Sequence, residues 1–149
     1  MTHGLEIITL QDLLLRVALV CVMAFLLGYD RKKKDKPVNY QSYMIVAVIS
    51  CLIAIMAQEL YANFSSVDNV IKLDLGKVIA GILTGIGFLG AGAIIKRSDD
   101  EEVIGTATGA GVWASGGLGL MLGFGFYSLA ILGFSIIWSV LSLLPRIVR

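Results

Sequence analysis

The stretch GIGFLGAG, residues 85–92, decides the fold of this chain. Its first six letters match G-x-G-x-x-G, the pattern of a dinucleotide-binding turn. Such a turn needs a strand before it and an acidic residue about 20 residues further on. Here the apolar run VIAGILT precedes the glycines, AGAIIKR follows them, and the later segment GTATGAG holds no acid. The stretch therefore indicates the interior of a membrane-spanning helix and argues against a phosphate-binding loop.

Composition places the whole chain in a membrane. Hydrophobic residues make up 57% of its 149 residues, charged residues make up 15%, and the mean hydropathy is +0.85. Soluble domains are about 45–50% apolar and about 25% charged, and a small domain cannot bury so much apolar surface. The net charge of +1 gives no basic surface for a nucleic acid, so we expect no such partner. The sequence predicts an all-α integral membrane protein.

Five stretches come close to the length of about 20 apolar residues that a spanning helix needs. They lack the alternation of a barrel strand, so their backbone is expected to be helical. The fourth is rich in glycine, and a partly re-entrant course stays open for it. We treat residues 1–149 as a single transmembrane domain. The predicted spans are residues 10–29, 43–61, 78–95, 103–122 and 126–144.

Lysine and arginine in the short loops predict the orientation of these spans. The segment DRKKKDKP follows the first span, Lys96 and Arg97 follow the third, and Arg146 and Arg149 follow the fifth. With five spans these three groups share one side, and the positive-inside rule makes that side cytoplasmic. The N-terminus is then outside and the C-terminus cytoplasmic. Tyrosines near the span ends suggest an interfacial belt; they are Tyr29, Tyr40, Tyr43, Tyr61 and Tyr127.

The glycines of the third and fourth spans form pairs four residues apart, such as Gly81 with Gly85 and Gly105 with Gly109. Residues at i and i+4 share a helix face, and small residues on one face allow two helix backbones to approach closely in lipid. We expect close helix packing, with unwound segments lining an ion path as the alternative. The predicted packing residues are Gly81, Gly85, Gly87, Gly90, Gly92, Gly105, Thr108, Gly109 and Trp113.

Arg16 lies inside the first span, where an arginine costs about 2.5–3.5 kcal/mol at the bilayer centre. It either marks a late helix start or has a partner in the bundle. We expect an ion pair with Asp74 at the start of the third span, and Asp12, one turn away, is the second choice. At the cytoplasmic end we expect a polar cluster, with solvated side chains as the alternative. Its predicted members are Asp30, Arg31, Lys96 and Arg97.

The sequence offers little to an enzyme. It holds no Ser–His, Cys–His or metal-ligand pattern, His3 stands alone, and Cys21 and Cys51 lie in apolar runs where we expect them to pack. We therefore expect no catalytic activity, no cofactor and no metal site.

These residues resemble the membrane domain of the bacterial MgtC/SapB family over most of the chain. The most specific match is LTGIGFLGAGAII, preceded by Asp74, and the next is Arg16 with GYDRKKKDKP after it. Gly105, Thr108 and Trp113 match a glycine–threonine–tryptophan pattern. The chain departs from the family at residues that would serve the cytoplasmic cluster. The departures are Asp30 for the usual Glu, Gln41-Ser42-Tyr43 for an Arg-Thr-His triplet, and Ala107 before Thr108 for paired threonines.

The resemblance implies a multi-pass protein of the bacterial inner membrane, without the soluble C-terminal domain of longer members. It also implies a link to growth under magnesium limitation and to virulence, through restraint of another membrane protein such as the F-type ATP synthase. The expected partners are membrane lipids and another membrane protein or a second copy of the chain. The main alternative is a transporter of Mg²⁺, another ion or a small solute, and a weaker one is a structural lipid-binding protein.

Overall fold

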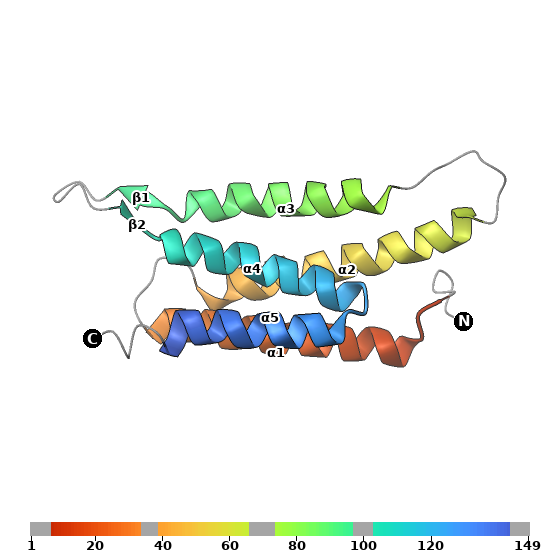
Figure 1. The fold of residues 1–149 in the computed structure, drawn as a ribbon, viewed down its shortest axis with the longest axis horizontal. Coiled ribbons are helices and arrows are strands. Elements are labelled where there is room, and N and C mark those ends of the chain that lie inside the picture. The colour runs from red at the N-terminus through yellow and green to blue at the C-terminus, as the bar shows by residue number, and fades with distance from the viewer. Residues whose placement is uncertain (1–6, 34–38, 66–73, 97–102, 144–149) are drawn as a thin grey trace.

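The computed structural model describes residues 7–33, 39–65, 74–96 and 103–143, apart from the side chains of residues 30–33 and 64–65. In this part of the chain the fold is a bundle of five α-helices with one short hairpin (Figure 1). The helices are α1 (Leu10–Lys33), α2 (Tyr40–Ser65), α3 (Leu75–Gly92), α4 (Thr106–Gly123) and α5 (Tyr127–Trp138), which continues as a π-helix over Ser139–Leu143.

The predicted all-α architecture is confirmed. One correction concerns the end of the third predicted span and the start of the fourth. Ile95 and Val103 are not helical. They lie in β1 (Ile95–Lys96) and β2 (Val103–Ile104), which pair antiparallel. Helix α3 ends near Ala93, whose backbone N–H bonds to the carbonyl of Gly90, and α4 begins only after Gly105, which has φ +92°.

Three of the helices are long and apolar enough to cross a membrane: Leu10–Tyr29, Tyr40–Asn63 and Leu75–Gly92. Helix α4 has 18 residues, but its glycines and threonines dilute the apolar content, and the apolar stretch Tyr127–Leu143 is shorter than a usual span. Five crossings, and the orientation derived from the basic loops, remain predictions.

Helix α4 is the centre of the bundle. It packs on α2 and α1 across one part of its surface and on α3 across another, so that α4 lies between α3 and α1 (Figure 1). Small residues make this possible, because 11 of its 18 residues are buried and five of those are glycines. The helix is continuous from Thr106 to Gly123, and whether it crosses the membrane or is re-entrant stays a prediction.

The contact of α4 with α2 depends on glycines, which have no side chain to hold the helices apart. A Cβ at Gly119 would collide with the carbonyl oxygen of Ala47, and one at Gly123 would lie 2.6 Å from the carbonyl oxygen of Cys51. Near the hairpin end, a Cβ at Gly111 would lie 2.7 Å from the hydroxyl oxygen of Tyr43. The glycines of α4 therefore let α2 approach to backbone contact.

The expected place of Tyr43 in an interfacial belt is wrong. Its side chain is fully buried, and its hydroxyl donates a hydrogen bond of 3.3 Å to the carbonyl oxygen of Thr108. A buried tyrosine needs such a partner for its hydroxyl. Because Gly111 leaves room for the ring, a residue expected at the membrane surface fills the core.

Candidate functional site

A polar cluster lies at the end of the bundle where α1, α3 and α5 begin and α2 and α4 end (Figure 1). We call it the Arg16 cluster. The Arg16 side chain comes from the second turn of α1 and is about 10% exposed. The other members come from α1 itself, from three further helices and from one turn. They are Asp12, Gln58, Tyr127 and the backbone of Gly123 and Gly125.

Every nitrogen of the Arg16 guanidinium has a partner. Its Nη2 lies 2.5 Å from Oδ2 of Asp12, its Nε donates to the Tyr127 hydroxyl at 3.2 Å, and its Nη1 donates to the carbonyl oxygen of Gly123 at 2.5 Å. The Tyr127 hydroxyl in turn donates to Oδ1 of Asp12. The charge is thus compensated inside the bundle, which is how an arginine is tolerated within a span.

The cluster also completes the C-terminal end of α4. Gly123 is the last residue of that helix, and its carbonyl accepts from Arg16 and from Nε2 of Gln58 at 2.6 Å. Carbonyls in the last turn lack partners within the helix and carry partial negative charge, so a cation is stabilising there. The turn that follows needs glycine at position 125, which has φ +80° and lies against the guanidinium.

The structure pairs Arg16 with Asp12 and not with Asp74. Asp74 is the N-cap of α3, where its Oδ1 accepts from the backbone N–H of Lys77 at 3.2 Å and its Oδ2 lies 3.9 Å from the Lys77 Nζ. Both acids lie at the same end of the bundle, as expected. The predicted pair fails because α4 separates α3 from α1 (Figure 1).

Sequence reasoning missed a further acid at this end, and this one is buried. Glu59 of α2 is only 4% exposed, and its carboxylate accepts from the backbone N–H of Ile8 at 2.8 Å and of Ile7 at 3.2 Å. It thereby holds the segment before α1 against α2. The available signal was the pair Gln58-Glu59 near the end of an apolar run, since polar residues in spans are costly and mark specific partners.

The glycines of α3 divide into two sets. Gly90 meets Gly109 of α4, because a Cβ at Gly109 would lie 2.5 Å from the carbonyl oxygen of Gly90. A Cβ at Gly87 would lie 4.0 Å from Cδ1 of the Trp113 ring. By contrast, a Cβ added at Gly81, Gly85 or Gly92 would have no atom of another described element within 4 Å. Within the described chain these three glycines pack against no other helix, so their predicted packing role stays a prediction, and the contact with α4 is made by the opposite face of the helix.

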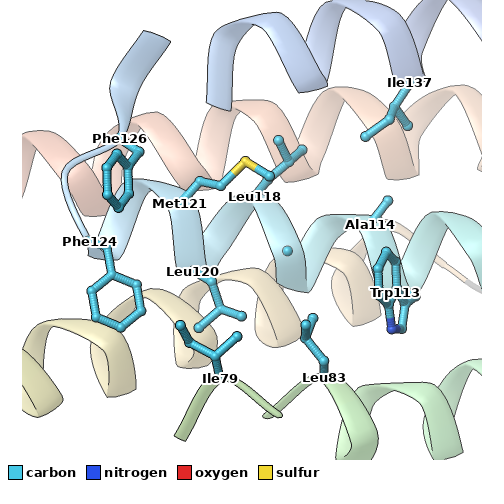
Figure 2. Close-up of a pocket in the computed structure, with 11 residues that line it drawn as sticks. Ile79, Leu83, Trp113, Ala114, Leu118, Leu120, Met121, Phe124, Phe126 and Ile137 are labelled. Carbon is cyan, nitrogen blue, oxygen red and sulfur yellow. The ribbon is translucent and has the colours of Figure 1, made fainter. Parts of the chain in front are cut away.

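The remaining predicted packing residues have different roles. Gly105 is the left-handed N-cap residue of α4, and a Cβ there would collide with the carbonyl oxygen of Ala93. Thr108 is fully buried. Trp113 is 47% exposed and lines an apolar groove of about 300 Å³ between α3 and α5, with α4 as its floor. Figure 2 shows Ile79 and Leu83 of α3 on one side of this groove and Ile137 on the other.

The predicted cytoplasmic cluster falls mostly outside the described residues. The side chains of Asp30 and Arg31 and the whole of Arg97 belong to that part, and Lys96 lies exposed in β1. Within the described ranges no group of three or more His, Cys, Asp or Glu residues gathers as metal ligands would.

The apolar helices and the compensated arginine inside the bundle define a helical membrane protein. A sequence profile of the MgtC family matches residues 17–149, so the chain belongs to the MgtC family. The expected resemblance is confirmed. No solved structure matches the chain.

Curated relatives support the same assignment. Protein SapB of Bacillus subtilis is 32% identical over 93% of this chain and 59% of its own length. The Escherichia coli K12 protein named "Putative magnesium transporter YhiD" is 29% identical over 82% of this chain and 55% of its own. Protein MgtC of Salmonella typhimurium LT2 is 27% identical over 79% of this chain and 46% of its own length. The chain thus spans about half the length of the curated relatives it matches.

Proposed function

We propose that this protein is a non-enzymatic regulator in the bacterial inner membrane that docks, helix against helix, on another membrane protein during adaptation to low magnesium. One observation carries the proposal. Helix α3 is long and apolar enough to span a membrane, yet only 11% of it is buried. Its outer face presents three glycines that contact no other element in the described part of the chain. Small residues on a lipid-facing surface are the feature that lets another helix approach closely.

The F-type ATP synthase is the partner we propose for this regulator, on the strength of the family membership. The test is purification of the tagged protein from membranes of cells grown in low magnesium, with the synthase subunits in the eluate quantified. Gly85→Leu should deplete them by at least tenfold. Gly117→Leu is the matched control, because no described atom lies within 4 Å of a Cβ added at Gly117, and this glycine of α4 lines the groove between α3 and α5 instead of the outer face of α3. Retention of the synthase by Gly85→Leu would contradict docking through α3.

A second candidate function is transport of Mg²⁺ or another small ion. It is favoured by the name of the relative YhiD and by Asp12, whose carboxylate is 31% exposed at the edge of the Arg16 cluster. Hard cations prefer oxygen ligands, and the Asp12 carboxylate would have to release Arg16 and the Tyr127 hydroxyl to bind one. The test is Mg²⁺ flux into liposomes that hold the purified protein, beside an authentic magnesium carrier. Flux that is lost in Asp12→Asn and kept in Asp74→Asn would establish transport and displace the regulatory role.

A further inference from the structure

The apolar groove between α3 and α5 is a second feature of the surface, and we call it the α4 groove because α4 forms its floor. Helices α3 and α5 both pack on α4, whereas their direct contact with each other is marginal, so the described part of the chain leaves the space between them unfilled. Phe124 and Phe126 stand at one end and Trp113 at the other (Figure 2). Apart from the Trp113 indole N–H, no described side chain in its wall forms strong hydrogen bonds.

We infer that the α4 groove holds one acyl chain of a membrane phospholipid, which lies along α4 between α3 and α5. The inference does not rest on the proposed function, because the wall of the groove is the side of α3 with Ile79 and Leu83 and not its outer glycine face. A polar ligand would lose its bound water in this groove and find at most one partner. The occupant is therefore apolar along the length that it buries.

The width of the groove favours a hydrocarbon chain over a helix. The groove has a volume of about 300 Å³, and its floor extends about 16 Å from Trp113 to Phe124 at 1.5 Å per residue, so its mean cross-section is about 20 Å². A helix with its side chains is about 10–12 Å across and would need about 80–110 Å². An extended acyl chain is only one carbon wide, with carbons in contact at about 3.5–4.0 Å, and fits.

The length of the groove matches one leaflet of a bilayer. The hydrocarbon core is about 30 Å thick, so that each leaflet contributes about 15 Å, close to the length of the floor. Phe124 directly follows the last residue of α4, so this end of the groove lies at the end of the bundle, at the depth of the lipid head groups. A chain that enters there would have its methyl end near Trp113.

Gly117 in the floor of the groove also points to an occupant from outside the chain. At every other glycine within α4, an added Cβ would lie closer than 3.0 Å to an atom of α2 or α3. At Gly117 no atom of another described element lies within 4 Å of that position. Glycine is less favourable than alanine inside a helix. Here its missing side chain gives the narrow groove the depth that an acyl chain needs.

A bound acyl chain would support α3 on the side that the protein leaves open. Only 11% of α3 is buried, and its main neighbour is α4. Hydrocarbon between Leu83 of α3 and Ile137 of α5 would supply the dispersion contacts that these two helices do not make with each other. The lipid would thereby help to hold the helix that carries the outer glycine face.

Trp113 provides a reporter inside the groove for the first test. The chain has two tryptophans, so Trp138→Phe leaves Trp113 alone, and Trp113→Phe leaves Trp138 alone at the exposed end of α5. Each purified variant in detergent is titrated with phosphatidylglycerol that carries brominated acyl chains, which quench tryptophan fluorescence on contact. Quenching of Trp113 should saturate near one lipid per chain. Quenching of Trp138 should rise gradually with the ratio of lipid to detergent.

Filling the floor of the groove should remove the site. Gly117→Leu on the Trp138→Phe background should raise the lipid concentration for half-maximal quenching of Trp113 at least tenfold. Gly85→Leu changes the outer face of α3 and should leave it unchanged. Saturation that survives a folded Gly117→Leu variant would overturn the inference. So would gradual quenching of both tryptophans without Gly117→Leu, which would mean ordinary contact with bulk lipid and does not depend on how that variant folds.

Photo-cross-linking in cells distinguishes lipid from protein as the occupant. The photoreactive amino acid benzoylphenylalanine in place of Met121, which lines the groove, should give a lipid adduct. In place of Phe88, which is 81% exposed on α3, it should give an adduct with the partner protein of the proposed function. A protein adduct or no adduct at Met121 would overturn the lipid site and leave the proposed function standing. Adducts only with lipid at Phe88 would contradict the proposed function and leave the lipid site standing.

Discussion

Arg16 shows what a single residue reveals in advance and what it does not. An arginine inside an apolar run must have partners, and its position identified it from the sequence alone. Which partners it has depends on the order of the helices around it. Asp12 lies on the same helix and needs only helical spacing, whereas Tyr127 and the Gly123 carbonyl come from residues more than 100 positions away. Nothing in the local pattern points to those two.

Replacing Arg16 tests its role in stability. Arg16→Met should lower the free energy of unfolding by about 3 kcal/mol, because breaking a buried ion pair leaves its partners uncompensated. The Gly123 carbonyl would keep only its bond from Gln58. Unfolding of the protein in mild detergent, followed by circular dichroism, measures the loss. Lys77→Met, at an exposed cation, should change stability by less than about 0.5 kcal/mol. Equal effects in the two variants would contradict the account.

Glu59 permits a second prediction at the residue scale. Glu59→Leu should raise hydrogen exchange of the Ile7 and Ile8 amides by about tenfold or more, since hydrogen bonds to charged groups contribute about 1.5–3 kcal/mol. Glu59→Gln keeps one acceptor oxygen and should have a smaller effect. Exchange is measured on the N-terminal peptide by mass spectrometry. Unchanged exchange in Glu59→Leu would mean that the carboxylate does not hold this segment.

At the scale of elements, the glycine pattern predicted close packing but could not assign the faces. A spacing of four residues places Gly105 and Gly109 on one helix face, and it places Gly81 and Gly85 on one face in the same way, so the spacing does not tell which pair meets another helix. In the structure Gly109 meets Gly90, Gly105 serves a turn, and Gly81 and Gly85 face outward. A helix with glycine on several faces has no single preferred side, so the neighbour that it meets is decided by the whole bundle. The short hairpin between α3 and α4 was missed because three of its four strand residues, Ile95, Val103 and Ile104, are apolar and extend the apolar runs on either side.

Replacing a glycine by alanine should have opposite effects on stability in the two sets of glycines. Gly109→Ala should destabilise the protein by about 1–3 kcal/mol, because the added carbon forces α3 and α4 apart. Gly81→Ala meets open space and should be neutral or stabilising by up to about 1 kcal/mol. Thermal unfolding in dilute detergent, where copies are separated, compares the two. A loss at Gly81 as large as that at Gly109 would contradict the assignment of faces.

At the scale of the whole molecule, composition and the family pattern predicted a membrane protein and the positions of its helices. Which helices are neighbours in the bundle had to come from the structure. The apolar runs place each helix because each is nearly continuous. That the glycine-rich α4 is the most buried helix is not visible in its hydropathy, which is diluted by the residues that allow its burial. The same dilution leaves open, by hydropathy alone, whether α4 crosses a membrane.

The position of α4 in the bundle argues that it does cross. It runs alongside α2 and α3, both long enough to span, from the hairpin to the Arg16 cluster (Figure 1). Single cysteines at its two ends test this in a chain with Cys21 and Cys51 replaced by alanine. Val103→Cys in the hairpin and Phe126→Cys in the turn before α5 are both at exposed positions. In intact cells a membrane-impermeant maleimide should label Phe126→Cys, and Val103→Cys should react only after the cells are opened. Labelling of both from one side would make α4 re-entrant and place the C-terminal part of the chain on the opposite face.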